Sequence, residues 1–224
     1  ISTIIASFVL KECHSDAATK ALGDVASGVP MTLAVTNKLG SWEPSDTDVA
    51  AAGTTLNGTA YFVQDAQKCD RFVVSATTPK GVALFLVDAN AAGVSITPDG
   101  IIDLTRDQAH VEFKNVEAIE LAAPGTGEAS LASALPAIQT IITADMVGAG
   151  EWLLQTTVDY STTRVQFDRP LGFFQAVKHP LVNVMLEIDR CKSLAYNAAC
   201  ALDVAESQSD RDEAAKFAHM AKAN

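Results

Sequence analysis

The sequence predicts an α+β protein with a short N-terminal helical segment, an antiparallel β-barrel or sandwich as its middle domain, and an antiparallel bundle of long helices at the C-terminus. Two observations predict this order. Residues 31–121 contain short runs of β-branched and aromatic residues separated by turn residues. Residues 131–224 instead place apolar residues three or four apart, as amphipathic helices do. The stretch 122–130, which contains Pro and Gly, lies between these patterns and is the predicted linker.

Residues 1–30 have a helical pattern and are assigned to the end of an N-terminal helical domain. Ser15 is placed to cap a second helix, and the segment 28–30, Gly-Val-Pro, ends it. No basic segment precedes the apolar run at the start, so the run is not typical of a signal peptide. Because the chain starts and finishes within helical patterns, we expect it to be part of a longer polypeptide.

The middle region is expected to form short strands. Their spacing of roughly ten residues favours an antiparallel barrel or sandwich. Asn57-Gly58 is expected to form a hairpin turn, since both residues of such a turn need positive φ. The sequence has no βαβ unit and no glycine-rich phosphate loop, so a Rossmann site is not predicted. The predicted strands are residues 31–36, 58–64, 71–77, 81–87 and 110–116.

The C-terminal region is expected to contain three helices. The first covers about residues 130–163, and the second carries an apolar seam over 177–202 with alternating steps of four and three. Their short connection makes them antiparallel neighbours. A third helix is expected to begin with a capping box formed by Ser209 or Asp210 with Glu213. Because these helices cannot cover both faces of one another, the seam predicts oligomerisation through the bundle.

Composition excludes several functional classes. The chain has 16 Lys and Arg against 27 Asp and Glu, a formal net charge of -11 that repels a phosphate backbone, so no nucleic-acid partner is expected. The longest apolar runs are shorter than the roughly 20 residues of a spanning helix, so no membrane span is expected. The four cysteines lack C-x-x-C spacing and indicate reduced thiols of a cytoplasmic protein. No histidine has a partner at metal-ligand spacing, so no metal site is predicted.

The residues after the first long helix allow two interpretations. Arg164 and Gln166 lie in the run Y-S-T-T-R-V-Q-F-D-R-P, at the C-terminal end of the predicted helix. A cation there complements the helix dipole. Alternatively, the two side chains bind an anionic cofactor, since a guanidinium group is a good fork for a pyrophosphate.

The same run, extended by L-G-F-F-Q-A-V-K-H, resembles the acyl-CoA dehydrogenase family pattern Y-x-x-x-R-x-Q-F-G-x-P-I-x-x-F-Q-x-v-K-H. Residues 57–64 and 70–74 resemble the hairpin and following strand of the family's middle domain, and residues 33–37 are similar to its A-x-T-E segment. The resemblance covers nearly the whole chain, in the family's order. It implies an FAD-dependent oxidoreductase of fatty acid and lipid metabolism. Such an enzyme dehydrogenates an acyl-CoA thioester at its α and β carbons and transfers a hydride to flavin N5.

Carried over position by position, the resemblance implies a set of binding residues. Those in the middle domain would contact the flavin ring, and those after the first long helix would contact the pyrophosphate and adenosine side of a neighbouring subunit's FAD. Ser41 would be the counterpart of a serine near the phosphates of the acyl-CoA substrate. The expected FAD-binding residues are Leu33, Val35, Thr36, Phe62, Gln64, Arg164, Gln166 and Phe167.

The chain departs from the family pattern where Asn37 replaces Glu, Ala60 replaces Lys and Asp168 replaces Gly. The catalytic base is absent from the chain as given. Most members carry it in a loop after the third C-terminal helix, and some on the first long helix, at the position of Ile138. No catalytic residue is therefore assigned.

Two alternatives to an acyl-CoA dehydrogenase remain open. One is a non-catalytic partner subunit of a heteromeric acyl-CoA dehydrogenase, and the other is an acyl-CoA oxidase-like flavoenzyme. The expected partners are an acyl-CoA substrate, an electron-transfer flavoprotein or similar acceptor, and further subunits, identical or different.

Overall fold

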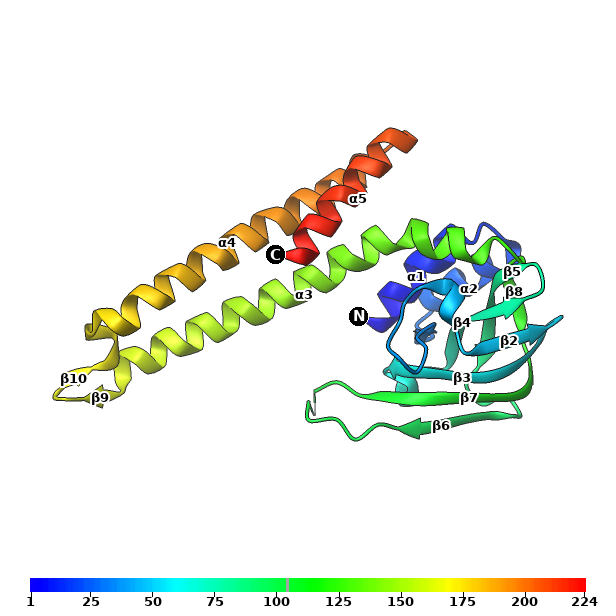
Figure 1. The fold of residues 1–224 in the computed structure, drawn as a ribbon, viewed down its shortest axis with the longest axis horizontal. Helices are drawn as coiled ribbons and strands as arrows, with labels where there is room; N and C mark the ends of the chain where they lie inside the picture. The colour runs from blue at the N-terminus through cyan, green and yellow to red at the C-terminus, as the bar shows by residue number, and fades with distance from the viewer. Residues whose placement is uncertain (104) are drawn as a thin grey trace. The chain divides into compact units, whose positions relative to one another are not determined.

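The computed structural model describes residues 1–103 and 105–224. The chain divides into two compact units, Ile1–Leu135 and Pro136–Asn224. The first contains two helices and a large sheet, and the second consists mainly of long helices (Figure 1). The predicted α+β class is therefore confirmed.

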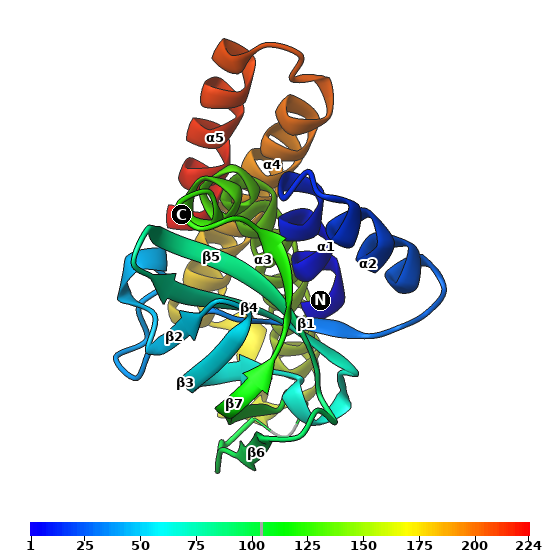
Figure 2. The ribbon, with the colours of Figure 1, turned by 90° about the vertical axis from the view of Figure 1, so that its right-hand side faces the viewer.

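Two short helices open the first unit, α1 (Ser2–Glu12) and α2 (Asp16–Ala26). Ser15 caps α2 as predicted, because its Oγ accepts a hydrogen bond from the Ala18 amide at 3.2 Å. The same hydroxyl donates to the Leu121 carbonyl at 2.7 Å and so fastens the start of α2 to strand β8 (Ile119–Ala122). Helix α1 packs against β1 (Met31–Ala34), beside which it lies in Figure 2, and α2 contacts β8.

Strands of the first unit form a mixed, mostly antiparallel sheet of eight strands in the order β6-β7-β3-β2-β4-β5-β8, with β1 paired to β4. The β1–β4 and β2–β4 pairs are parallel. Sequence patterns missed β2, β6 and β8, which are short. The strands are β1 (Met31–Ala34), β2 (Val49–Ala52), β3 (Thr55–Gln64), β4 (Arg71–Thr78), β5 (Gly81–Asp88), β6 (Val94–Pro98), β7 (Gln108–Glu117) and β8 (Ile119–Ala122).

Alternating apolar side chains of these strands build the core of the first unit. Phe72, Phe85 and Phe113 are almost completely buried. The rings of Phe72 and Phe113 meet edge to face, with centroids 6.5 Å apart. This core supports the strands that position the candidate site.

Asn57-Gly58 does not form the predicted hairpin turn. Both residues lie within β3, and the turn from β2 to β3 occurs earlier, at Gly53. The pairing of β3 with β7 shifts between Leu56 and Asn57, which marks a β-bulge. Gly58 has φ +135°, and a Cβ there would lie 2.2 Å from the Asp48 carbonyl oxygen, so the close backbone approach requires glycine.

The long helices are α3 (Gly127–Thr163), α4 (Gln175–Val204) and α5 (Gln208–Ala223). Within the second unit, α3 and α4 run antiparallel: Lys192 Nζ lies 2.6 Å from Glu151 Oε1, while Gly172 lies close to Ser161. Helix α5 packs along α4 (Figure 1). Small side chains at this contact, including Ala198 and Ala218, are buried.

The cap of α5 differs from the predicted one. Ser207 Oγ accepts from the Asp210 amide at 3.2 Å, and the Asp210 carboxylate accepts from the Ser207 amide at 2.9 Å. This reciprocal pair is a capping box whose cap residue lies two residues before Ser209 and three before Asp210, the two predicted caps. Two serines close together make the start ambiguous from sequence alone.

The predicted seam on α4 is only partly covered. Ala195 and Ala198 are buried where α5 packs, but Val184 is 47% exposed. Helix α3 is long and apolar enough, by length and composition, to cross a bilayer, although a core helix of a water-soluble protein meets the same criteria. The expected absence of a membrane span therefore stays a prediction.

Candidate functional site

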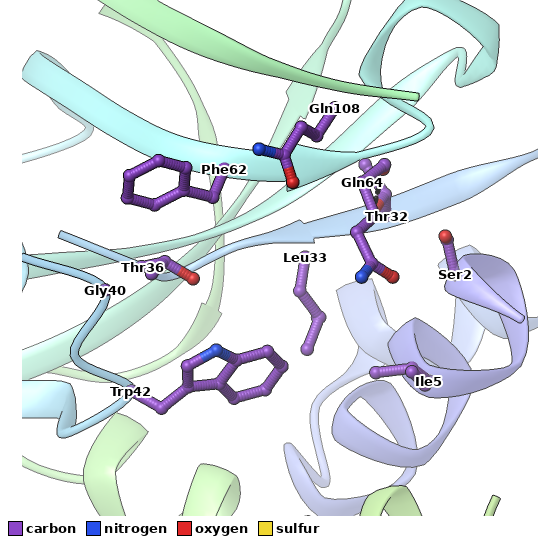
Figure 3. Close-up of a pocket in the computed structure, with 10 residues that line it drawn as sticks. All are labelled: Ser2, Ile5, Thr32, Leu33, Thr36, Gly40, Trp42, Phe62, Gln64 and Gln108. Carbon is purple, nitrogen blue, oxygen red and sulfur yellow. Dashed lines mark hydrogen bonds between the residues drawn. The ribbon is translucent and has the colours of Figure 1, made fainter. Parts of the chain in front are cut away.

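A cavity of about 290 Å³ lies in the first unit, where α1, β1, β3, β7 and the loop after β1 meet (Figure 3). Its lining combines two aromatic rings, two aliphatic side chains, two primary amides and several hydroxyl groups, with no ionisable side chain among the ten lining residues. The lining residues are Ser2, Ile5, Thr32, Leu33, Thr36, Gly40, Trp42, Phe62, Gln64 and Gln108.

Four of the residues predicted for flavin contact meet in this cavity: Leu33, Thr36, Phe62 and Gln64. They come from β1, the residues after it, and β3, which are separated in sequence. Val35 lies between two of them but is buried and is not part of the lining.

A second irregularity in β3 presents Phe62 to the cavity. The pairing of β3 with β7 is interrupted between Ala60 and Val63, and Phe62 has φ +53°. The Tyr61 amide donates to the Thr36 carbonyl at 2.9 Å, which holds this part of β3 beside the residues after β1. Bulges of this kind redirect side chains, and the Phe62 ring remains 38% exposed at the cavity wall.

Gln64 and Gln108 are cross-strand partners on β3 and β7. Their side-chain amides extend toward the cavity in Figure 3, and within the described residues neither amide has a hydrogen-bond partner. Thr32 Oγ1 donates to the Gln64 carbonyl at 2.8 Å and fixes the backbone there. A pair of amides offers both donors and acceptors to the polar edge of a ligand.

Sequence reasoning missed six contributors to the lining: Ser2, Ile5, Thr32, Gly40, Trp42 and Gln108. Ser2 donates its hydroxyl to Asp65 at 2.5 Å. These residues carry no motif that could have marked them. Only the antiparallel pairing of Gln108 with Gln64 would have pointed to one of them, and that register was not predictable.

The loop after β1 is organised by Asn37. Its Oδ1 accepts from the Leu39 and Ser41 amides, both at 2.9 Å. Ser41 Oγ in turn donates to Asp46 at 2.7 Å, so the hydroxyl predicted for substrate contact is bound to a carboxylate. An anionic phosphate at Ser41 would approach that negative charge. The neighbouring Trp42, rather than Ser41, turns its side chain toward the cavity (Figure 3).

Arg164, Gln166 and Phe167 lie in the second unit and are not among the cavity-lining residues. They belong to a hairpin of β9 (Val165–Gln166) and β10 (Arg169–Pro170). Phe167 and Asp168 occupy its turn with φ +52° and +58°, the backbone of a type I′ turn. The three side chains are exposed, and among the described residues the Arg164 guanidinium has no ion-pair or hydrogen-bond partner.

Neither the buried thiols nor Ile138 suits acid–base or nucleophilic chemistry. Burial raises the pKa of the Cys69 and Cys13 thiols to about 11, so these thiols stay protonated near neutral pH. Ile138, at the position of the base in some family members, is 2% exposed and cannot accept a proton. Among the described residues no group of three or more His, Cys, Asp or Glu side chains is placed to hold a metal ion. The cavity is therefore built for binding rather than proton transfer.

Sequence comparison finds a related family. Residues 125–223 match the family model described as acyl-CoA dehydrogenase, C-terminal domain. Acyl-CoA dehydrogenase FadE27 of Mycobacterium tuberculosis is 34% identical over 174 residues, which are 75% of this chain and 44% of that protein. The chain thus spans less than half the length of this curated relative.

Solved structures share the fold. The Tcur3481-Tcur3483 steroid ACAD is 28% identical, with a TM-score of 0.81 over 99% of this chain and 59% of that chain. Butyryl-CoA dehydrogenase from Megasphaera elsdenii, at 22% identity, has a TM-score of 0.80 over 98% of this chain and 63% of that chain. Together, the family model, the sequence relative and the shared fold confirm the resemblance: the chain belongs to the acyl-CoA dehydrogenase family.

Proposed function

We propose that the chain is part of an FAD-dependent acyl-CoA dehydrogenase that removes hydrogen from the α and β carbons of an acyl-CoA thioester, in fatty acid and lipid metabolism. The cavity of the first unit carries this proposal. It pairs aromatic and aliphatic surface with two free amides at one edge. A flat fused ring with one polar edge is the kind of ligand that suits such a lining.

The donor set fits the flavin ring of FAD. Phe62 and Trp42 offer aromatic surface, and Gln64 and Gln108 offer hydrogen-bond donors and acceptors to the ring's polar edge. A volume of about 290 Å³ is at the lower end of ligand pockets, roughly 300–1,000 Å³. This volume suits the ring system, while the rest of the dinucleotide would lie outside the cavity.

FAD, when bound, supplies the hydride acceptor of the reaction. The residues of this chain orient the ring and shield it from water. The cavity lining supplies no proton acceptor, since none of its ten residues has an ionisable side chain, and Ile138 is a buried hydrocarbon.

Ile138, a buried hydrocarbon at one of the two base positions of the family, favours a second candidate function, a non-catalytic subunit that pairs with a catalytic chain. In this arrangement the chain contributes FAD-binding surface and its partner contributes the base. Both candidates involve assembly through the helical unit, where α4 exposes a stripe of apolar residues that includes Val182, Met185 and Leu186. An electron-transfer flavoprotein or similar carrier would reoxidise the flavin. The four free cysteines are consistent with a cytoplasmic location.

Arg164 is proposed to bind the FAD pyrophosphate of a neighbouring subunit. Its exposed guanidinium lacks a partner among the described residues and is free to form a bidentate contact. Each charge-assisted hydrogen bond contributes roughly 1.5–3 kcal/mol. Arg164→Ala should therefore weaken FAD binding by about one to two orders of magnitude, at about 1.4 kcal/mol per factor of ten.

The test is flavin absorbance retained through gel filtration after incubation with FAD. Arg164→Lys should restore only part of the binding, because an ammonium group cannot form the fork. Arg211→Ala, which removes another exposed arginine from the second unit, is the matched control and should retain FAD as wild type does. Equal flavin occupancy in wild type and Arg164→Ala would contradict this role and leave Arg164 only the role of complementing the dipole of its helix.

Activity separates the remaining candidates. The full-length polypeptide of a catalytic dehydrogenase should bleach its own flavin when an acyl-CoA is added without oxygen, whereas that of a non-catalytic subunit should do so only after its partner chain is added. Rapid oxygen consumption during turnover would instead favour an acyl-CoA oxidase-like enzyme.

A further inference from the structure

Phe62 needs support from its surroundings. Its φ of +53° lies in the left-handed region, which is costly for an aromatic residue. The ring is 38% exposed at the cavity wall, so burial does not hold it firmly. Residues in such strained backbone persist where neighbouring groups restrain them.

His110 is placed to supply this restraint. It lies on β7, in the strand that pairs with β3, and it is not part of the cavity lining. Its ring meets Phe62 edge to face, with centroids 5.7 Å apart at 82°, and meets Tyr61 at 4.8 Å and 63°. The imidazole therefore contacts both residues of the irregular part of β3.

Asp99 lies against the imidazole in turn. Its Oδ1 lies 2.9 Å from His110 Nδ1, although the two atoms do not have normal hydrogen-bond geometry, and its side chain is 16% exposed. The Asp99 amide donates to the Gln108 carbonyl at 2.9 Å, which anchors this carboxylate beside β7.

We infer that His110, restrained by Asp99, is a positioning residue that fixes the Phe62 ring at the cavity wall and so shapes the surface offered to a planar ligand. The effect of His110 on FAD binding rests on the proposed function. The restraint on Phe62 does not require FAD, so the restraint and FAD binding can be tested separately. His110 acts through Phe62 and does not contact the ligand.

The first test uses nuclear magnetic resonance on the full chain without FAD. Nuclear Overhauser effects between the Tyr61 and Phe62 rings, whose centroids are 6.3 Å apart, report the position of Phe62. They should disappear in His110→Ala and persist in His110→Phe, which keeps an aromatic ring. Glu112→Gln on the same strand, which loses its ion pair with Lys114 but touches neither ring, should leave them unchanged.

The second test is FAD affinity, measured by fluorescence titration. We expect His110→Ala to raise the FAD dissociation constant by about tenfold, and His110→Phe to restore it to within about threefold, from the strength of one aromatic contact. If the Tyr61–Phe62 nuclear Overhauser effects persist in His110→Ala, the inference is overturned. It is also overturned if these effects disappear while the FAD dissociation constant stays unchanged. If wild type does not bind FAD, the proposed function fails while the ring measurement still decides the role of His110. Should His110→Ala not fold, Asp99→Asn replaces it and should loosen the same ring contacts.

Discussion

The two units of the chain differ in how completely they bury their own apolar side chains. In the first unit the large core residues, such as Phe72, Phe85 and Phe113, are almost fully buried between paired strands and helices. In the second, large apolar residues on both long helices remain exposed, including Trp152, which is 66% exposed. Burial of apolar surface is the main stabilising contribution to folding. The comparison therefore indicates that the β-rich unit completes its core alone, whereas the helical unit needs further covering.

The largest expected effect contrasts the two kinds of apolar residue. Phe72→Ala should lower the free energy of unfolding by about 3–5 kcal/mol, because it leaves a cavity in the core of the first unit. Val184→Ala, at a half-exposed site on α4, should cost less than about 0.5 kcal/mol in the isolated chain. Urea denaturation measures both. A Val184→Ala cost close to that of Phe72→Ala would mean that the seam of α4 is already covered.

The next prediction tests whether another subunit covers the apolar stripe of α4. Leu186 is 57% exposed on the apolar stripe of α4. If subunits associate there, Leu186→Glu should weaken association by about 30-fold, the effect of losing a contact worth about 2 kcal/mol. Sedimentation velocity across a concentration series is the measurement. Leu39→Glu, at an exposed leucine of the first unit, is the matched control and should sediment as wild type does.

Helix caps provide a smaller, matched comparison. Ser15→Ala removes the cap of α2 together with the hydrogen bond to the Leu121 carbonyl, while Ser207→Ala removes the capping box of α5. A lost cap costs about 1 kcal/mol. Ser15→Ala should cost more than this value, because the helix also loses its link to the sheet. In Ser207→Ala, hydrogen exchange should show faster exchange of backbone amides in α5 alone. Faster exchange in the sheet as well would contradict the separation of the two units.

The smallest expected effects concern the stability of the protein at acidic pH. Hydrogen bonds from the Thr55 and Thr54 hydroxyls lower the pKa of Glu117 in the first unit, and the Ser207 amide and hydroxyl lower the pKa of Asp210 in the second. A carboxyl group with a lowered folded pKa contributes stability that is present above its unfolded pKa, about 4. This stability is lost as pH falls through the lower folded pKa.

Thr55→Val and Ser207→Ala should each flatten the dependence of thermal stability on pH in this acidic range. Thr59→Val makes the same substitution in β3 at a threonine that does not pair with Glu117, and it is the control for Thr55→Val. A Thr55→Val protein with the wild-type acid profile would show that the Glu117 contacts do not persist in solution.

Local sequence patterns were enough to predict the helices, the longer strands and the α+β class. The apolar spacing of α3 and α4 and the Ser15 cap depend on residues within a few turns of one another. The run around Arg164 was likewise readable because its motif is contiguous. These features are determined by neighbours in the chain.

Only the tertiary structure decided how Phe62, Gln64 and Gln108 meet around one cavity. Their arrangement depends on the register of β3 against β7 and on two bulges, and one inserted residue changes which way a side chain faces. Asn57-Gly58 shows the same limit, since a pair with strong turn preference became part of a bulge where the Asp48 backbone passes within van der Waals range of Gly58. Close approach between distant segments is a property of the folded chain, and no local pattern encodes it.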